Sequence, residues 1–386
     1  MRIACYCQHV LGIGHLHRSL AICRELASRH QVCLIVGGPK VAIDGGPIVV
    51  IELPGLMMDP EFHHLTPCEP GQDLDRLKER RRRHLREALE AFRPDVFFVE
   101  LYPFGRKAFR FELDPALAAI RNGEIPHCRS VVSLRDILVE RPDDRKRFEQ
   151  RAVTTLNQYF DGLLIHADSS VITLDATFGR CPDIGIPCHY TGFVVPQRPG
   201  LSRTAKRRQL GLAPDERLIV VSVGGGNVGA ELLVAACAAF LRLHDTDQLR
   251  MQIFTGPYCP PTTVADLQQN LPPDCSLARF TDHFADWLMA ADLSISMAGY
   301  NTCFNIVQTG VPALVYPFGQ NREQTFRAQR LAERADMALL TAADLNPATL
   351  ARQIQVMLGH ARYRTTINLA GAVGSREQLE RWYREA

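Results

Sequence analysis

Residues 293–328, LSISMAGYNTCFNIVQTGVPALVYPFGQNREQTFRA, contain the pattern that decides the fold. A short apolar run ends at Ser296 and predicts a buried strand. The small residues and the hydroxyl within 298–302 favour the start of a helix, and the Gly-Val-Pro break at 310–312 ends it. A second apolar run follows at 313–318. This alternation of strands and helices indicates an α/β chain with parallel strands.

The ends of these two predicted strands carry polar groups. The carboxyl ends of parallel strands meet at one edge of a sheet, where open α/β sheets bind ligands. A helix that starts within 299–302 leaves backbone N–H groups unpaired and presents a partial positive charge at this edge. Glu323 and Gln324 stand at the start of the next helix. We therefore expect an anionic ligand here.

Two glycine-rich turns follow the same logic. Residues 220–230, VVSVGGGNVGA, predict a strand, a turn and a helix. Adjacent glycines are costly unless the backbone needs their freedom, and a diphosphate held by backbone N–H groups would need it. The N-terminal Gly12-Ile13-Gly14-His15 turn also precedes an amphipathic helix. For this first motif, a tight turn without a ligand is the alternative interpretation.

In order and type, these motifs resemble those of GT-B nucleotide-sugar glycosyltransferases, especially the N-acetylglucosaminyltransferases that form lipid II. The resemblance implies an α/β GT-B fold, with two facing Rossmann-like domains and a central cleft. It also implies inverting, metal-independent transfer of a sugar to a hydroxyl acceptor, such as a cell-envelope, polysaccharide or lipid-linked glycan. The expected donor is a nucleotide-sugar with UDP as its nucleotide, and no further cofactor or metal is expected.

The resemblance also assigns donor-binding residues. At the position of Asn305 the family usually has a glutamate that binds the ribose, and an amide lacks the charge of that carboxylate, so the nucleotide base stays open. The residues implied are Gly224, Gly225, Gly226, Asn227, Gly299, Tyr300, Asn301 and Thr302 for the diphosphate, Phe284 for the nucleobase, Asn305 for the ribose, and Glu323 and Gln324 for the sugar hydroxyls.

Two residues compete for the role of catalytic base. His15 stands at a predicted helix start, where the helix dipole disfavours the imidazolium and keeps a neutral base available. Glu100 ends the apolar run PDVFFVE, at the ligand edge of a parallel sheet. A histidine that only caps its helix, and a carboxylate paired with Arg106 or Arg135, are the alternatives. The other acceptor-side candidates are Gly12, Gly14, Arg106, Asp136 and His166.

A predicted helix over Asp73–Phe92 carries the basic run Arg80–Arg86. Such a run is usually a solvated face. The alternative is attraction to an anionic membrane surface or a phosphorylated acceptor, which would make the protein peripheral to the inner membrane.

Bulk composition excludes several classes of protein. The 386 residues are 46% apolar and 22% charged, which is typical of a globular protein of two domains. The formal net charge of +2 gives no reason to expect a nucleic-acid partner. The 12 cysteines are scattered without metal-ligand spacing, and neither a signal peptide nor a transmembrane segment is recognised. We therefore expect a cytoplasmic protein with reduced thiols.

Composition shifts place the expected domain boundaries. We expect an acceptor-binding Rossmann-like domain over 1–196, a linker over 197–214, a nucleotide-sugar-binding Rossmann-like domain over 215–370, and a helix over 371–386 that crosses back to the first domain. Two other functions fit the same motifs. One is a UDP-sugar 2-epimerase, which shares the fold, and the other is a protein that binds a nucleotide-sugar without chemistry.

Overall fold

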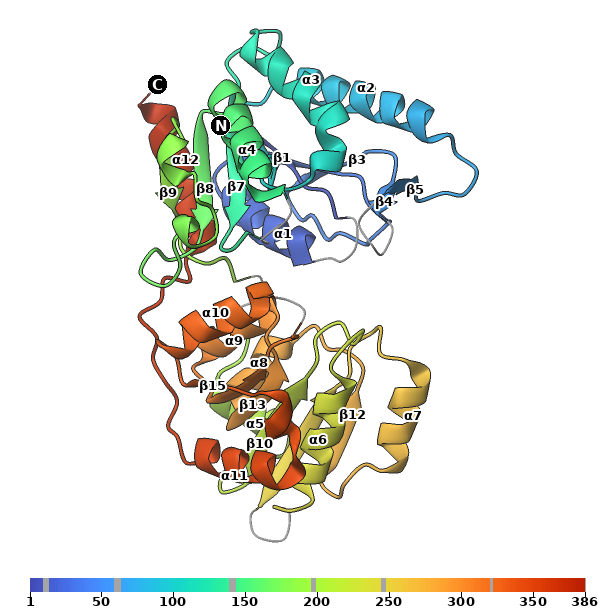
Figure 1. The fold of residues 1–386 in the computed structure, drawn as a ribbon, viewed down its shortest axis with the longest axis vertical. Helices are drawn as coiled ribbons and strands as arrows, with labels where there is room; N and C mark the ends of the chain where they lie inside the picture. The colour runs from blue at the N-terminus through green and yellow to red at the C-terminus, as the bar shows by residue number, and fades with distance from the viewer. Residues whose placement is uncertain are drawn as a thin grey trace. The chain divides into compact units, whose positions relative to one another are not determined.

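The computed structural model describes residues 1–9, 14–58, 64–138, 144–195, 199–243, 248–319 and 322–385. The chain divides into two compact units (Figure 1). Unit 1 comprises Met1–Pro196 and Asn368–Ala386, and unit 2 comprises Gln197–Ile367. Among the described residues, no helix is both long and apolar enough to cross a membrane.

The sheet of unit 1 has the strand order β3-β2-β1-β6-β7-β8-β9, and its strands pair in parallel. The order reverses between β1 and β6, so these neighbours form a topological switch point. The strands are β1 (Arg2–Tyr6), β2 (Gln31–Val36), β3 (Val49–Glu52), β6 (Val96–Glu100), β7 (Arg129–Arg135), β8 (Gly162–His166) and β9 (Cys188–Tyr190).

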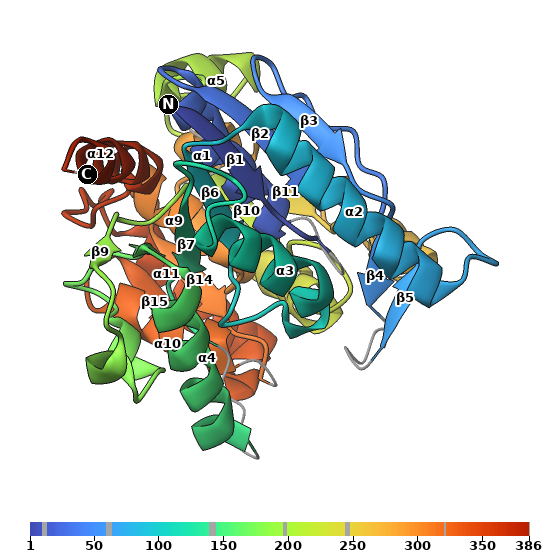
Figure 2. The same ribbon diagram turned by 90° about the horizontal axis from the view of Figure 1, so that it is seen from above.

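Successive side chains of β1 point to opposite faces of this sheet, and both faces are buried. Ile3 and Cys5 belong to the core that packs against the apolar face of α1, whereas the Tyr6 hydroxyl on the opposite face donates to Glu112 of α3. Figures 1 and 2 show α2 and α3 side by side. The helices of unit 1 are α1 (Gly14–Ala27), α2 (Leu74–Phe92), α3 (Arg110–Arg121), α4 (Arg145–Tyr159) and α12 (Gly371–Arg384), with the 3-10 turns η1 (Lys107–Phe109), η3 (Leu174–Ala176) and η4 (Cys181–Asp183).

The C-terminal helix α12 packs against α1. Arg376 of α12 donates to Glu25 at 2.9 Å, and His30 lies 3.1 Å from Glu380. An antiparallel bridge joins Val194 to Ala370 just before the helix. The end of the chain is therefore an integral part of unit 1.

The sheet of unit 2 has the order β12-β11-β10-β13-β14-β15, again parallel, and reverses between β10 and β13. Its core consists of aliphatic side chains of the strands and of α6 and α11. The elements are α5 (Arg203–Gln209), β10 (Arg217–Ser222), α6 (Ala230–Phe240), β11 (Leu249–Phe254), α7 (Pro261–Gln269), β12 (Cys275–Ala278), α8 (Phe284–Ala290), β13 (Leu293–Met297), α9 (Tyr300–Thr309), β14 (Ala313–Tyr316), α10 (Arg322–Ala332), β15 (Met337–Leu339), η5 (Ala342–Leu345) and α11 (Pro347–Leu358).

One segment differs from the organisation expected from sequence. The segment 197–214, expected as a linker, contains helix α5, whose N-cap Ser202 accepts from Ala205 and whose Arg203 is paired with Asp292 of the same unit. In unit 1, the antiparallel strands β4 (Leu56–Met58) and β5 (Leu65–Pro67) form a separate two-stranded sheet. Elements this short leave almost no periodic signal in a sequence.

Candidate functional site

The switch point of unit 1 brings together the two candidate bases. His15 lies in the first turn of α1, just after β1, and Glu100 is the last residue of β6, the neighbour of β1. The sheet topology therefore delivers both side chains to the edge where open α/β sheets bind ligands. Gly14 begins α1, while Gly12 lies outside the described residues.

Glu100 is the centre of a cluster of positively charged and hydrogen-bond-donating groups. Its side chain is only 2% exposed, and its Oε1 lies 2.6 Å from His15 Nδ1 and accepts from Arg18 at 2.8 Å. Arg106 Nε lies 3.5 Å from the second oxygen, Oε2. Burial raises the pKa of the Glu100 carboxyl, but His15, Arg106 and Arg18 together lower that pKa well below its usual range. Glu100 is therefore an ionised carboxylate at neutral pH.

The ionised carboxylate fixes the tautomer of His15. Nδ1 must carry the proton, because a lone pair there would face the Glu100 oxygen at 2.6 Å. The other nitrogen, Nε2, is then a free acceptor, and no partner for it occurs within the described part of the chain. The His15 side chain is 24% exposed, so this nitrogen can be reached from outside.

The same surroundings keep His15 neutral. Burial lowers its pKa to about 4, and the nearby Arg106 and Arg18 act in the same direction against the attraction of Glu100. A neutral imidazole that donates from Nδ1 to a buried carboxylate and exposes Nε2 is arranged to accept a proton. The geometry thus separates the roles of two residues that the sequence left in competition.

The other acceptor-side candidates lie at neighbouring strand ends but are deeply buried. His166 at the end of β8 is 0% exposed, with Nε2 2.7 Å from Ser133 Oγ and Nδ1 3.0 Å from Thr191 Oγ1. Asp136, just after β7, is also 0% exposed. Both side chains therefore lie beneath the edge rather than on it.

We expect His166 to make the stability of the protein depend on pH. Burial lowers its pKa to about 3, whereas an unfolded histidine titrates near 6.5. Its contribution is therefore fully present above pH ~6.5 and is lost as the pH falls toward 3, with a slope of up to ~1.4 kcal/mol per pH unit. Denaturant unfolding of wild type and His166→Gln at pH 4, 5, 6 and 7 measures this slope. Equal slopes for both proteins would contradict the assignment.

In unit 2 the glycine turn lies at the equivalent switch point. It connects β10 to α6, and β10 is paired with β13, which leads into α9. Gly224 and Gly226 have φ angles of 67° and 90°, a region that favours glycine. Gly224, Gly225 and Asn227 are exposed, so the backbone of this turn can be approached closely from outside.

The start of α9 forms the other half of this edge. Its N-cap is Gly299, and among the described residues no side-chain hydrogen bond caps this end of the helix. Asn301 and Thr302 are half-buried in this first turn. Asn305, one turn further, is 5% exposed, and its buried Oδ1 has no partner among the described residues. Contact between Asn305 and a ribose stays a prediction.

Glu323 and Gln324 begin α10, beside the start of α9. Glu323 pairs at 2.6 Å with Arg327, whose guanidinium lies 5.1 Å from the centre of the Tyr300 ring. Gln324 Oε1 accepts from the amide of Phe318 at 3.2 Å. These contacts bring the starts of two helices together, while binding of sugar hydroxyls by Glu323 and Gln324 stays a prediction.

Two exposed aromatic side chains at this edge were missed in the sequence. Tyr258 follows β11 and is 61% exposed, with its Cδ2 3.7 Å from where a Cβ on Gly225 would lie. Phe280 follows β12 and is 60% exposed, whereas the predicted Phe284 packs edge-on against Phe254. The available signal was an aromatic residue in the loop that follows a strand.

The sequence suggested either a solvated face or an anion-binding surface for the basic run of α2, and one of its residues fits neither. Arg81 is 0% exposed and pairs with Glu112 of α3, so it belongs to the interior and not to a surface run. Lys78, Arg82, Arg83 and Arg86 pair with acids, four of them on α2 itself. This neutralisation weakens the attraction expected for an anionic membrane, and membrane contact stays a prediction.

Comparisons with known protein sequences match mainly the part of the chain that forms unit 2. Residues 220–373, less than half of the chain, match the Glycosyltransferase family 28 C-terminal domain. A UDP-N-acetylglucosamine--N-acetylmuramyl-(pentapeptide) pyrophosphoryl-undecaprenol N-acetylglucosamine transferase of Synechococcus elongatus is 31% identical over 176 residues, covering 43% of this chain and 47% of the relative. The enzyme of the same name from Frankia casuarinae is 28% identical over 167 residues, covering 43% and 44%. The chain thus matches less than half the length of these relatives.

Solved structures extend the likeness to the whole chain. The calicheamicin glycosyltransferase CalG4 superposes with a TM-score of 0.64 at 17% identity, covering 99% of this chain and 98% of its own. Acinetobacter baumannii MurG superposes with a TM-score of 0.55 at 14% identity, covering 97% and 94%. The predicted fold class is therefore confirmed: the chain has the GT-B glycosyltransferase fold, and its second unit resembles the family 28 C-terminal domain of the lipid-II-forming enzymes.

Proposed function

We propose that this protein is an inverting glycosyltransferase that moves a sugar from a UDP-sugar to a hydroxyl acceptor, with His15 as the base. The observation that carries the proposal is the His15–Glu100 pair at the switch point of unit 1, in which Nδ1 is held at 2.6 Å and Nε2 is open. Because unit 2 resembles the Glycosyltransferase family 28 C-terminal domain, we assign binding of the donor to this unit.

His15 and Glu100 take different parts in the proposed reaction. The acceptor hydroxyl gives its proton to His15 Nε2 while its oxygen attacks the anomeric carbon, and the bond from that carbon to the diphosphate breaks. The electron pair leaves with UDP, and a single displacement inverts the anomeric centre. Glu100 stabilises the imidazolium that forms and holds the ring in place, so it is a positioning residue.

The donor diphosphate binds at the switch point of unit 2. The exposed turn at Gly225 and Asn227 and the start of α9 bring backbone N–H groups and a helix dipole to one edge, while the Gly224 N–H donates to Ser222 Oγ at 3.3 Å. Such donors stabilise negative charge as it develops on the leaving diphosphate, so we propose that transfer needs no added divalent metal. The exposed rings of Tyr258 and Phe280 lie on adjacent loops of this edge and suit contact with the nucleobase.

Binding and turnover test this function in order. A thermal-shift screen of UDP, GDP, dTDP, CDP and ADP should select UDP, because a ligand at 100 times its Kd adds about 2.7 kcal/mol to stability. UDP-N-acetylglucosamine is then incubated with candidate hydroxyl acceptors, with and without EDTA, and UDP release is measured. A new epimer of the donor without any acceptor would point to the epimerase instead. Binding of UDP with no turnover of any UDP-sugar would favour the non-catalytic alternative.

Substitutions at two neighbouring glycines should distinguish an effect on donor binding from an effect on folding. A Cβ on Gly226 would lie 2.4 Å from the Thr255 carbonyl oxygen at a φ of 90°, so Gly226→Ala should destabilise unit 2. Among the described residues, a Cβ on Gly225 would come within 4 Å of the Tyr258 ring alone, at 3.7 Å. We expect Gly225→Ala to leave Tm nearly unchanged and to weaken UDP binding about tenfold. Unchanged UDP affinity in Gly225→Ala would show that the diphosphate does not approach this turn.

A further inference from the structure

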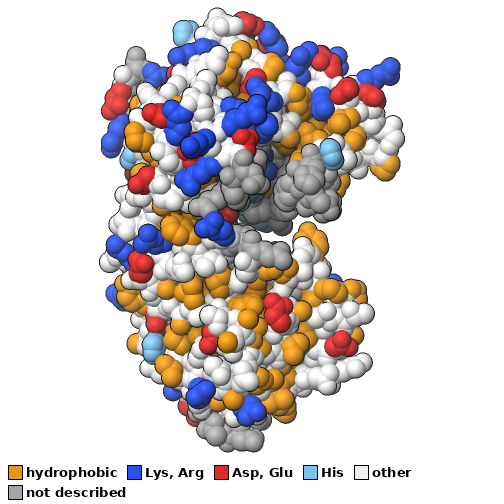
Figure 3. All heavy atoms as spheres, viewed as in Figure 1, with side chains coloured by type: hydrophobic (Ala, Val, Ile, Leu, Met, Phe, Trp, Pro, Cys, Tyr) orange, Lys and Arg blue, Asp and Glu red, His pale blue; other side chains and the backbone are white. Residues whose placement is uncertain are grey.

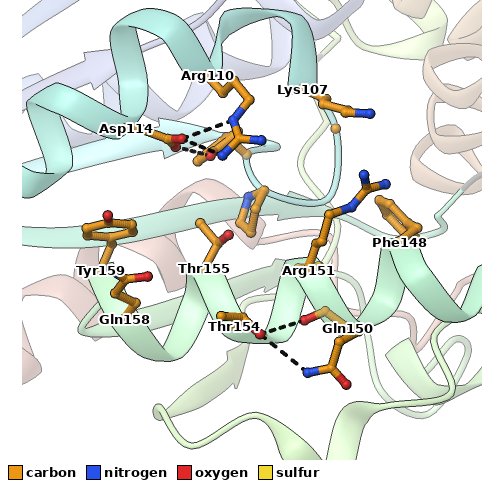
Figure 4. A pocket seen from close by; sticks show the side chains of 14 residues that line it. Lys107, Arg110, Asp114, Phe148, Gln150, Arg151, Thr154, Thr155, Gln158 and Tyr159 are labelled. Atoms are coloured by element: carbon orange, nitrogen blue, oxygen red, sulfur yellow. Dashed lines mark hydrogen bonds and ion pairs between the residues drawn. The ribbon is translucent and has the colours of Figure 1, made fainter.

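Unit 1 contains a cavity that the proposed chemistry does not use. It has a volume of about 300 Å³ and is lined by residues of α3, of α4 and of the loop that follows β6 (Figure 4). Helix α3 contributes Arg110 and Asp114, and α4 contributes residues from Phe148 to Tyr159. Tyr102, Pro103 and Gly105 of the loop complete the wall. The volume suits a monosaccharide-sized ligand.

The charged side chains that line this cavity favour an anion. Lys107, Arg110 and Arg151 line it together with one carboxylate, Asp114. Asp114 is already engaged, because Arg110 donates to it at 2.9 and 3.0 Å. Figure 3 shows Lys and Arg side chains gathered on the face of unit 1 where α3 and α4 lie. The lining therefore keeps an excess of positive charge.

Among the described residues, Lys107 is available to a ligand and Arg151 is paired only with a half-exposed carboxylate. Within the described chain no carboxylate lies within 4.0 Å of Lys107, and the partner of Arg151 is the half-exposed Asp144 at 3.3 Å. Figure 4 shows Arg151 extending from α4 toward the side of the cavity where Lys107 lies.

The remaining lining groups match a polyhydroxylated body. Thr155 and Gln158 offer a hydroxyl and an amide group along α4, and Tyr159 offers a ring and a hydroxyl. The Thr154 hydroxyl is engaged within α4, because it donates to the Gln150 carbonyl at 2.9 Å. Figure 4 shows these side chains on the α4 side of the cavity, opposite Arg110 and Asp114. A few polar groups and an aromatic ring beside a cationic end are what a sugar with an attached phosphate or carboxylate requires.

The cavity is connected to the His15–Glu100 pair through one short loop. Residues 101–106 run from Glu100 to the cavity, and Tyr102, Pro103 and Gly105 line it while Arg106 lies 3.5 Å from Glu100 Oε2. A molecule that fills the cavity therefore contacts the loop that follows Glu100 and contains Arg106.

We propose that this α3–α4 cavity binds an oxyanion group, a phosphate or a carboxylate, carried by the sugar-sized acceptor. The inference rests on the proposed function, because it assigns an anionic acceptor to the transferase. Lys107 and Arg151 bind the oxyanion by charge-assisted hydrogen bonds, and the α4 hydroxyl and amide groups bind the body of the sugar. The same chemistry would fit a free anionic effector, and the experiment separates the two.

Binding is measured first, without turnover. Glucose 6-phosphate, glucose and inorganic phosphate are titrated into the full-length protein and into the variants Lys107→Ala/Arg151→Ala and Lys146→Ala/Arg147→Ala. The second variant removes the same charge from exposed positions near the start of α4 that do not line the cavity. We expect glucose 6-phosphate to bind at least tenfold more tightly than glucose, the cavity variant to lose at least tenfold in affinity, and the control to stay within twofold. Equal binding by all three proteins would overturn the inference.

Turnover then distinguishes an acceptor from an effector. With UDP-N-acetylglucosamine and glucose 6-phosphate, an acceptor subsite predicts a tenfold higher KM for glucose 6-phosphate in the cavity variant, with slow hydrolysis of the donor unchanged. Glucose 6-phosphate that alters the donor hydrolysis rate without being glycosylated would overturn the acceptor assignment. Transfer to neutral acceptors alone, with no binding of glucose 6-phosphate, would overturn the inference and leave the proposed function intact. Binding lost only in the cavity variant, with no UDP-sugar ever turned over, would support the oxyanion site and contradict the proposed function.

Discussion

His15→Ala should lower kcat about 10³-fold, with little change in the KM for the UDP-sugar. The imidazole Nε2 is the open acceptor at the switch point of unit 1, and general-base catalysis by a positioned side chain contributes 10²–10⁴-fold. The donor binds to unit 2, so its affinity should not depend on this side chain. UDP release at saturating donor measures the effect, and an unchanged Tm shows that folding is intact.

The controls for His15 distinguish a base from a structural residue. His17→Ala removes an exposed histidine two residues further along α1 and should leave kcat within twofold. Glu100→Gln should lower kcat by ~10²-fold or more, because it removes the charge that stabilises the imidazolium and holds Nδ1 protonated. The acidic limb of kcat/KM should lie near pH 4, as the lowered pKa of His15 requires, and not near 6.5. Full activity in both His15→Ala and Glu100→Gln would mean that another group is the base.

The sequence was most informative where a local rule fixes geometry. Glycines after an apolar strand and before a helix identify a tight turn at the ligand edge, and Gly224 and Gly226 do adopt the positive φ angles that such a turn requires. Strand–helix alternation also indicated two parallel sheets. That α/β class is confirmed by the sheets and by the GT-B structures they resemble.

The partition of roles within the site could not be obtained from local rules. His15 and Glu100 are 85 residues apart, and their pairing depends on β6 lying next to β1. A sequence lists the carboxylate and its candidate partners but does not reveal which of them approach it. The structure selects His15, Arg18 and Arg106, while Arg135 donates to the Ile137 carbonyl. Arg18 gave no sequence signal, because a helical arginine is usually solvated.

The basic run of α2 is a second case in which the sequence does not reveal the partner of a charged residue, here in the protein interior. Helical spacing places Leu77, Arg81, Leu85 and Leu89 on one face, and all four are buried. Periodicity therefore predicts burial at position 81, but an arginine there contradicts the expectation that buried positions are apolar. The conflict is resolved by Glu112, which a sequence pattern on α2 alone cannot reveal.

Arg81→Met should lower the free energy of unfolding by about 3–5 kcal/mol, the largest stability effect we expect. All five guanidinium N–H groups are used: Nε and Nη2 donate to Glu112 at 2.9 and 2.6 Å, Nη1 donates to the carbonyls of Gly37 and Pro54, and Nη2 also donates to Gln8. Removing the cation leaves the Glu112 carboxylate, which is 0% exposed, without its charge partner. Urea unfolding followed by circular dichroism measures the loss.

The neighbouring Arg82 provides the matched control for this prediction. Its side chain is 50% exposed and pairs with Glu79 of the same helix, so Arg82→Met should change stability by less than ~1 kcal/mol. The double variant Arg81→Met/Glu112→Leu should recover part of the loss, because it removes the uncompensated carboxylate together with the cation. The Tyr6 hydroxyl, which donates to Glu112, would then lose its partner, so recovery should be incomplete. If Arg81→Met costs no more than Arg82→Met, the guanidinium does not support the interior of unit 1, and the basic run is a solvated face after all.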